Sequence, residues 1–274
     1  MDITLDYQFQ PSPRYGHGRS AHAGLYQILE NKRATFEHYL HAFASFQGDF
    51  LNTPLGENHD APEQPYWGNG FFPGVDAVSL HCMLCIERPR TFCEIGSGHS
   101  TRFARHAIRL RSLPTQIISI DPHPRAEVDA ICDTVVRQPV EDLAPEYFDR
   151  LDSGDVLSID SSHRSFTNSD VTAFYLDILP RLKPGVLIHI HDVFLPYDYP
   201  PEWSDRFYNE QYLLACVLLA RTPSYEIELA NTFITYDSRL ISLVSRIFDH
   251  PALVDSAPYA WITQTGWSFW MRKL

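Results

Sequence analysis

The chain has 274 residues and a net charge of −12, and 44% of its residues are hydrophobic. This length is enough for one large α/β domain with additions, and the apolar content can supply its core. The acidic charge argues against a nucleic-acid partner. No run approaches the ~18 consecutive apolar residues of a membrane span, and the N-terminus lacks the basic and apolar regions of a signal peptide. We therefore expect a cytoplasmic protein with no nucleic-acid and no membrane partner.

The five cysteines are odd in number and irregularly spaced, which is typical of reduced thiols. Cys82 and Cys85 form a CxxC pair, for which redox chemistry or zinc binding is an alternative. The chain has no second CxxC, and the pair lies in an apolar pattern with helical spacing. Burial within a helix is therefore the favoured interpretation.

The first part of the chain, residues 1–70, is predicted to form an N-terminal arm, a helix and a loop. Residues 1–27 contain scattered Pro and Gly and no sustained period, so we expect an irregular arm. From about 28 to 47, apolar residues recur at helical spacing. That apolar stripe must cover either the main domain or a second subunit, so a homodimer through this helix is one of two expectations. A long loop is expected at 48–73.

Strand and helix patterns then alternate, and residues 71–274 are predicted to form the main domain. A helix is expected over 75–87. Five strands are expected at 91–95, 116–120, 134–137, 156–159 and 186–190. Helices are expected between these strands, at 100–111, 126–132, 145–151 and 169–182. Later elements are expected as an aromatic loop at 194–203, a helix at 209–221, strands at 225–236 and 266–272, and a helical stretch near 240–248.

This alternation predicts an α/β fold with a Rossmann-like doubly wound sheet and helices on both faces. We expect about seven strands, mostly parallel, with an antiparallel last strand. Ligands bind to such sheets at the carboxyl ends of the strands. The residues that directly follow each strand are therefore the site candidates.

Residues 91–106 place a Gly-rich turn between a strand and a helix. Such a turn lets a ligand approach the backbone, and N–H groups of the first helical turn point at anionic atoms. A dinucleotide fingerprint would have a third glycine where Thr101 stands. The segment Glu94-Ile95-Gly96-Ser97-Gly98 instead resembles motif I of the class I S-adenosylmethionine (SAM) methyltransferases.

The resemblance implies SAM as cofactor, bound near the Gly-rich turn. The implied cofactor-binding residues are Glu94, Gly96, Ser97, Gly98, Ser100, Thr101 and Asp121. Asp121 ends the second strand, 23 residues beyond Gly98, where a carboxylate is placed to accept both ribose hydroxyls. NAD would use an acid there equally, and the alternative for Asp121 is a turn-forming residue before Pro122.

Acids and histidines also follow the fourth and fifth strands. Asp160 and His163 follow the fourth, and His191 and Asp192 follow the fifth. These segments resemble catechol-type and macrolide-sugar O-methyltransferases. More broadly, four segments together resemble a bacterial methyltransferase family of mostly undefined substrate, namely residues 69–74, 94–101, 159–163 and 189–201. The resemblance implies Asp160, His191 and Asp192 as ligands of a divalent metal. An imidazole ligand shifts the preference from Mg²⁺ toward Mn²⁺, Fe²⁺ or Zn²⁺. The alternative is that His191 is hydrogen-bonded without a metal.

His163 lies at the offset where the catechol-type family places a general-base Lys. The reference pKa of an imidazole lies near neutrality, which suits proton removal from a hydroxyl or amine. His163 and Asp160 are therefore the predicted catalytic residues, with Asp160 as an orienting group or metal ligand. The alternative for His163 is a residue that caps the following turn.

The sequence thus predicts a SAM-dependent methyltransferase that acts on a hydroxyl or amine of a small molecule. Aromatic residues after the fifth strand are placed to wall an acceptor pocket. One alternative is an NAD-dependent oxidoreductase, which the missing third glycine and missing Tyr-x-x-x-Lys pair disfavour. The other is a non-catalytic SAM- or nucleotide-binding protein, in which His163, Asp160 and Asp192 would have no task.

Overall fold

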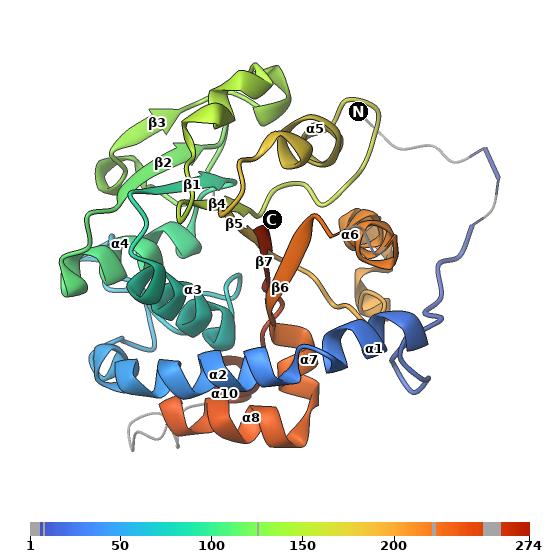
Figure 1. Ribbon diagram of the computed structural model, residues 1–274. Coiled ribbons are helices and arrows are strands. Elements are labelled where there is room, and N and C mark those ends of the chain that lie inside the picture. The colour runs from blue at the N-terminus through green and yellow to red at the C-terminus, as the bar shows by residue number, and fades with distance from the viewer. Residues whose placement is uncertain (1–5, 8, 125, 221–222, 249–258) are drawn as a thin grey trace.

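The computed structural model describes residues 6–7, 9–124, 126–220, 223–248 and 259–274. Its centre is a seven-stranded sheet with the order β3-β2-β1-β4-β5-β7-β6 (Figure 1). The strands are β1 (Thr91–Ile95), β2 (Gln116–Ile120), β3 (Thr134–Val136), β4 (Val156–Ile159), β5 (Leu187–Ile190), β6 (Tyr225–Ala230) and β7 (Phe269–Lys273). Strands β1 to β5 pair in parallel, whereas β7 is antiparallel to both β5 and β6. The predicted sheet with an antiparallel last strand is confirmed.

Helices cover both faces of this sheet, as predicted. The helices are α1 (Ala23–Glu30), α2 (Arg33–Phe43), α3 (Gly74–Glu87), α4 (His99–Arg111), α5 (Asp170–Ala173), α6 (Glu210–Leu219), α7 (Asn231–Tyr236), α8 (Ser238–Ser245) and α10 (Tyr259–Gln264). Figure 1 shows α3 and α4 on one side of the sheet and α5 and α6 on the other. Because both faces are covered, the central strands β4 and β5 are buried along their whole length.

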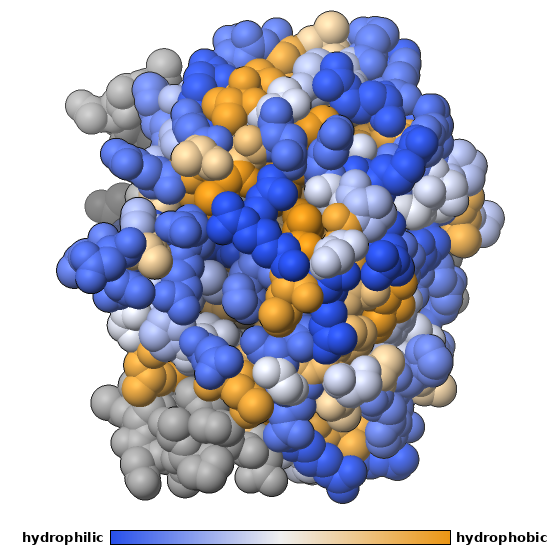
Figure 2. Space-filling model, turned by 90° about the vertical axis from the view of Figure 1, so that its left-hand side faces the viewer, coloured by the Kyte–Doolittle hydropathy of each residue, from blue (hydrophilic) through white to orange (hydrophobic). Residues whose placement is uncertain are grey.

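On the face that Figure 2 shows, apolar side chains form patches that hydrophilic ones interrupt. None of the helices in the described part of the chain is long and apolar enough to cross a membrane.

The predicted N-terminal helix is broken into two, and the arm is shorter than expected. Helix α1 already begins at Ala23, α2 follows it, and a 3-10 turn extends to Phe50. The apolar stripe of α2 packs on α8 and β6 of the same chain. The main domain of the same chain is therefore the observed partner of that stripe. The homodimer and the domain boundary after residue 70 stay predictions.

Several other predicted elements have different bounds or types. Residues 225–236 were expected as one strand, but β6 ends at Ala230 and α7 follows. The buried Asn231 side chain explains the change, because its Nδ2 donates to Asp76 Oδ1 at 2.7 Å and to Ser79 Oγ at 2.9 Å. Short 3-10 turns replace the helices expected at 126–132 and 145–151. The helix expected at 169–182 continues after α5 as a π-helical turn and ends near Pro180, which cannot donate a backbone hydrogen bond.

The order of the strands reverses between β1 and β4, and a glycine makes that junction compact. Gly96 directly follows β1 with φ of 82°, and its N–H donates to Ile120 O at 3.0 Å. A Cβ atom built on Gly96 would lie 1.9 Å from the carbonyl oxygen of Asp160. Only glycine lets the end of β1 approach the end of β4 this closely.

Gly96→Ala should therefore destabilise the fold by about 2–5 kcal/mol, the sum of left-handed strain and overpacking. Gly154→Ala is the matched control, since Gly154 has φ of 88° but no described atom within 4 Å of a built Cβ. The control should lose only the strain, about 1–2 kcal/mol. Urea unfolding measures both free energies. Equal losses in the two variants would contradict the importance of the contact with Asp160.

Candidate active site

A cavity of about 350 Å³ lies at the carboxyl ends of β1, β2 and β4, the edge where doubly wound sheets bind ligands. This volume lies within the range of small-molecule sites. Five of the seven predicted cofactor residues line it: Gly96, Ser97, Gly98, Ser100 and Asp121. The loop expected at 48–73 ends beside the cavity, because Phe71 and Phe72 form part of its wall.

The Gly-rich turn is tied to the end of β2 by Asp121. Ser97 N–H donates to Asp121 Oδ2, and His123 N–H donates to Oδ1, each at 2.8 Å. A carboxylate can accept about four hydrogen bonds, so Asp121 retains acceptor capacity at the cavity. No described atom lies within 4 Å of a Cβ built on Gly98, so a side chain there would project into open space.

The other two predicted cofactor residues, Glu94 and Thr101, are fully buried and do not line the cavity. Thr101 Oγ1 accepts a hydrogen bond from Gly98 N–H at 3.0 Å and donates one to the Glu94 carboxylate. Burial raises the pKa of Glu94 to about 7, although hydrogen bonds from Ser100 and Thr101 oppose this shift. These two side chains therefore stabilise the Gly-rich turn without lining the cavity.

The predicted catalytic and metal residues come together at the carboxyl ends of β4 and β5. His163 Nε2 lies 3.2 Å from Asp160 Oδ1 and 3.4 Å from Asp192 Oδ2. Ligand-type atoms of these three residues lie within 4.8 Å of one another. His163, which was predicted as a base, thus completes a compact group that could hold a metal ion.

His191 lies beside this group, and one of its ring nitrogens faces two of the group's carboxylates. His191 Nδ1 is 3.4 Å from Asp160 Oδ1 and 3.5 Å from Asp192 Oδ1. This buried nitrogen makes no hydrogen bond to any residue that the structure describes. An unsatisfied buried polar atom is unusual and calls for an explanation such as a bound ion.

Two buried carboxylates that the sequence did not single out hold the far side of each imidazole. Glu210 Oε2 lies 2.9 Å from His163 Nδ1, and Asp76 Oδ2 lies 3.1 Å from His191 Nε2. Asp76 also accepts main-chain hydrogen bonds from Trp267 and Ser268. An acid in the otherwise apolar pattern of α3 was the one available signal for Asp76.

The electrostatics of the cluster follow from burial and close opposite charges. Burial would lower the pKa of His163, but hydrogen bonds to Asp160 and Glu210 raise it well above its usual value. The charges of Asp160 and Asp192 likewise outweigh burial and raise the pKa of His191. The same imidazoles outweigh burial at Asp160 and hold its pKa well below the ordinary range. The carboxylates of the cluster therefore stabilise positive charge that lies between them.

The backbone is also strained here. His163 and Asp192 are non-glycine residues with φ of 58° and 55°. A left-handed backbone of this kind costs of the order of 1–3 kcal/mol and is frequent at functional sites. These two cluster residues, which follow β4 and β5, thus carry strain that packing must stabilise.

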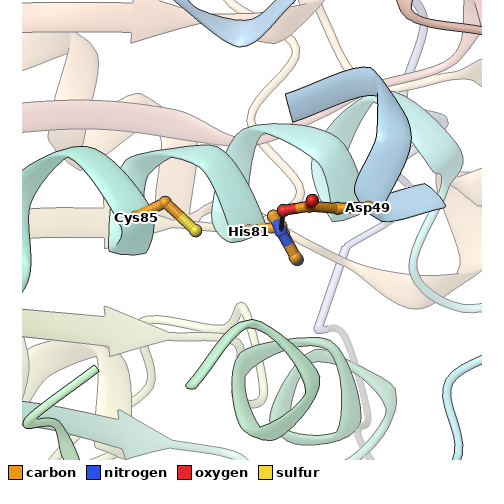
Figure 3. A group of neighbouring side chains, drawn as sticks. All are labelled: Asp49, His81 and Cys85. Atoms are coloured by element: carbon orange, nitrogen blue, oxygen red, sulfur yellow. Dashed lines mark hydrogen bonds and ion pairs between the residues drawn. The ribbon is translucent and has the colours of Figure 1, made fainter. Parts of the chain in front are cut away.

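A second group of Asp49, His81 and Cys85 lies near the other end of α3 (Figure 3). Arg111 binds the Asp49 carboxylate through two nitrogens, at 2.8 and 2.5 Å, and His81 Nε2 lies 2.7 Å from the same carboxylate. Burial raises the pKa of the Cys85 thiol to about 12 and raises the pKa of the Cys82 thiol well above its ordinary value. Because a guanidinium already neutralises Asp49 and both thiols stay protonated, we interpret this group as structural. The predicted burial of the CxxC pair is confirmed.

Comparison with known proteins agrees with this geometry. Residues 93–193 match a protein-family model described as a methyltransferase domain. That segment runs from β1 to just beyond β5 and contains both the Gly-rich turn and the Asp160 cluster. The chain therefore contains a methyltransferase domain, and the activity that this match supports is SAM-dependent methyl transfer.

Solved structures of methyltransferases resemble the chain only distantly. The SAH-bound plantazolicin methyltransferase BpumL is 12% identical, covers 90% of this chain and 99% of its own, and has a TM-score of 0.44. The SAH-bound methyltransferase PaMTH1 of Podospora anserina is 14% identical, with coverages of 73% and 89% and a TM-score of 0.40. No curated protein matches the chain. The family match and the strand order, rather than these neighbours, carry the assignment.

The methyltransferase match sets aside the two alternatives that the sequence left open, an oxidoreductase and a non-catalytic binding protein.

Gly98→Val should abolish binding of S-adenosylhomocysteine (SAH), because the branched side chain would occupy open space at the cavity wall. Isothermal titration calorimetry measures the binding, and a thermal unfolding curve checks that the fold persists. Undiminished SAH binding in a folded Gly98→Val protein would remove this turn from the cofactor site.

Proposed function

We propose that this methyltransferase transfers the methyl group of SAM to a hydroxyl or amine of a small molecule, at a centre that holds a divalent metal. The observation that carries the proposal is the group of Asp160, His163 and Asp192, whose ligand-type atoms lie within 4.8 Å of one another beside the buried Nδ1 of His191. We further propose a cytoplasmic setting, in keeping with the five free cysteines.

The residues of the cofactor cavity fit SAM. The open space at Gly98 suits a ligand lying against the backbone, and Asp121 offers carboxylate oxygens for ribose hydroxyls. Asp160 lines this cavity and also belongs to the metal-type group. SAM supplies a methyl group on a positively charged sulfur, and the shared residue Asp160 supports a position for that charge next to the carboxylate cluster.

The residues of the cluster fit a divalent ion. Asp160, His163 and Asp192 offer one nitrogen and two carboxylates, with His191 Nδ1 adjacent. Mixed nitrogen and oxygen donors suit Mn²⁺, Fe²⁺ or Zn²⁺ better than Mg²⁺. When bound, such an ion stabilises negative charge that develops on an acceptor oxygen.

Glu210 and Asp76 act as positioning residues. Histidine ligands in metal sites usually donate their second N–H to a carboxylate, which fixes the tautomer and the ring orientation. Glu210 holds His163 Nδ1 and Asp76 holds His191 Nε2, so both remaining nitrogens face the Asp160 and Asp192 carboxylates. Both carboxylates are buried, which keeps water from competing for the imidazoles.

Methyl transfer forms a bond from the acceptor oxygen or nitrogen to the methyl carbon while the S–C bond breaks and its electron pair stays on sulfur. The acceptor must also lose a proton. A base role for His163 remains the sequence prediction, but its raised pKa disfavours that role, because a protonated imidazole cannot accept a proton. Its Nε2 belongs to the metal-type group, which supports a ligand role in which a bound cation replaces the imidazole proton.

The metal can be tested on the whole enzyme. After dialysis against EDTA, the wild-type protein should bind about one Mn²⁺ per chain by calorimetry, whereas Asp192→Asn should not. SAH formation with pooled hydroxyl and amine compounds should stop in EDTA and return with Mn²⁺. Asp49→Asn is the matched control and should bind Mn²⁺ normally, because Asp49 belongs to the Arg111 ion pair. Normal Mn²⁺ binding by Asp192→Asn, or full activity in EDTA, would contradict the proposed centre.

The two roles considered for His163 give different results in Glu210→Gln and His163→Ala. If His163 is a ligand, His163→Ala should lose the metal, and Glu210→Gln should bind Mn²⁺ about 10–100-fold more weakly. If His163 is a base, His163→Ala should keep the metal while its kcat falls by roughly 10²–10⁴-fold. Elemental analysis and SAH formation at saturating Mn²⁺ decide between them. Unchanged metal content and unchanged turnover in His163→Ala would exclude both roles.

A further inference from the structure

Two adjacent aromatic residues at the end of the long loop connect the cofactor cavity with the metal-type cluster. Phe71 lines the cavity, and its ring stacks on that of His99 with a centroid distance of 5.7 Å and an interplanar angle of 10°. Phe72 also lines the cavity, and its ring centroid lies 5.0 Å from that of His191. Phe72 is buried, whereas Phe71 remains 52% exposed. Phe71 therefore has ring surface that a ligand in the cavity can contact.

A tight turn around the buried Asn69 side chain fixes the position of the Phe71 ring. Asn69 Nδ2 donates hydrogen bonds to Tyr66 O at 2.9 Å and to Phe72 O at 3.1 Å. Asn69 Oδ1 accepts hydrogen bonds from the N–H groups of Phe71 at 3.0 Å and Phe72 at 2.7 Å. The Tyr66 ring also contacts His99, edge-on at 5.4 Å. Because the protein itself holds the Phe71 ring, a ligand can contact it with little further loss of conformational freedom.

The order of the strands gives the cofactor cavity a direction. The strands follow one another as β3-β2-β1-β4, so the segment after β3 and Asp121 after β2 line one end, and Asp160 after β4 lines the other. With the ribose at Asp121, as proposed above, the sulfur of SAM lies past Gly98 toward Asp160. Phe71 borders this part of the cavity, because its ring stacks on His99, the residue that directly follows Gly98.

The carboxylates that line the cavity are already engaged with other groups of the protein. Asp121 accepts two main-chain hydrogen bonds, and Asp170 accepts hydrogen bonds from Ser162 N–H at 2.7 Å and from the Ser162 hydroxyl at 2.6 Å. Asp160 Oδ1 lies within 3.4 Å of two imidazole nitrogens. Glu141 follows β3, at the opposite end of the cavity from Asp160. The face of an aromatic ring is therefore a further group at the Asp160 end that can attract a cation.

We propose that the ring face of Phe71 binds the positively charged sulfur of SAM, so that the site prefers SAM over the neutral product SAH. This inference rests on the proposed function. The face of an aromatic ring carries negative partial charge and attracts a cation that lies within about 6 Å of the ring centroid. Methyl transfer removes the positive charge from the sulfur, so the same ring holds the product more weakly than the cofactor. Phe71 thereby favours exchange of SAH for SAM after each reaction.

Calorimetry with SAM and with SAH tests this role without a methyl acceptor. Phe71→Leu keeps an apolar side chain but removes the ring face, so the ratio of SAM affinity to SAH affinity should fall about three- to thirtyfold. The affinity for SAH should stay within about twofold of the wild-type value. Phe166→Leu is the matched control and should leave the ratio unchanged, because Phe166 is 44% exposed and does not line this cavity. Replacement of Phe71 by pentafluorophenylalanine keeps the ring but reverses the partial charge of its face, and should lower the ratio at least as much.

The proposal is overturned if Phe71→Leu leaves the ratio unchanged or weakens SAM and SAH binding equally, since a ring that only packs against the ligand would contribute to both. A wild-type ratio in the pentafluorophenylalanine protein would overturn it as well. That protein also decides the question if Phe71→Leu misfolds and loses SAH binding, because its ring has a similar shape to that of Phe71. If the wild-type protein binds neither SAM nor SAH, the proposed function fails and this inference fails with it. If the wild type binds both ligands and the ratio does not respond, only the role of Phe71 is refuted.

Discussion

The close contact between Gly96 and the main chain of Asp160 is the constraint on which the site depends. It lets β1 and β4 end side by side at the point where the strand order reverses. On one side of this junction the Gly-rich turn opens the cofactor cavity. On the other side Asp160 directs its carboxylate toward the histidines that follow β4 and β5. The absence of a Cβ atom at Gly96 thus allows the cofactor cavity and the metal-type cluster to lie side by side.

The second constraint is electrostatic. Four buried or half-buried carboxylates surround the imidazoles of His163 and His191, namely those of Asp76, Asp160, Asp192 and Glu210. Buried acids of this kind are tolerated only with compensating positive charge. The imidazoles supply part of that charge when protonated, and a divalent cation would supply it while leaving them neutral. The left-handed backbones of His163 and Asp192 indicate that the fold accepts strain to keep this arrangement.

Much of this architecture could be predicted because strand periodicity marks where each strand ends, and the polar residues there must share one edge of the sheet. This reasoning predicted the position of four residues at that edge, where the structure has them: Asp121, Asp160, His191 and Asp192. The roles of Asp76 and Glu210 could not be predicted, because they lie on helices far from the strand ends in sequence. The helix at 231–236 was also missed, since its apolar and β-branched residues resemble a strand and only tertiary hydrogen bonds to Asn231 explain its turn.

A metal ion is proposed to lie between the ends of β4 and β5, next to the cofactor. The most direct test is anomalous diffraction at the manganese edge from crystals grown with SAH and Mn²⁺. We expect an anomalous peak within bonding distance of Asp160, His163 and Asp192, with SAH in the cavity that Gly98 and Asp121 line. SAH in that cavity without such a peak, or a peak at Asp49 and His81 instead, would contradict the account.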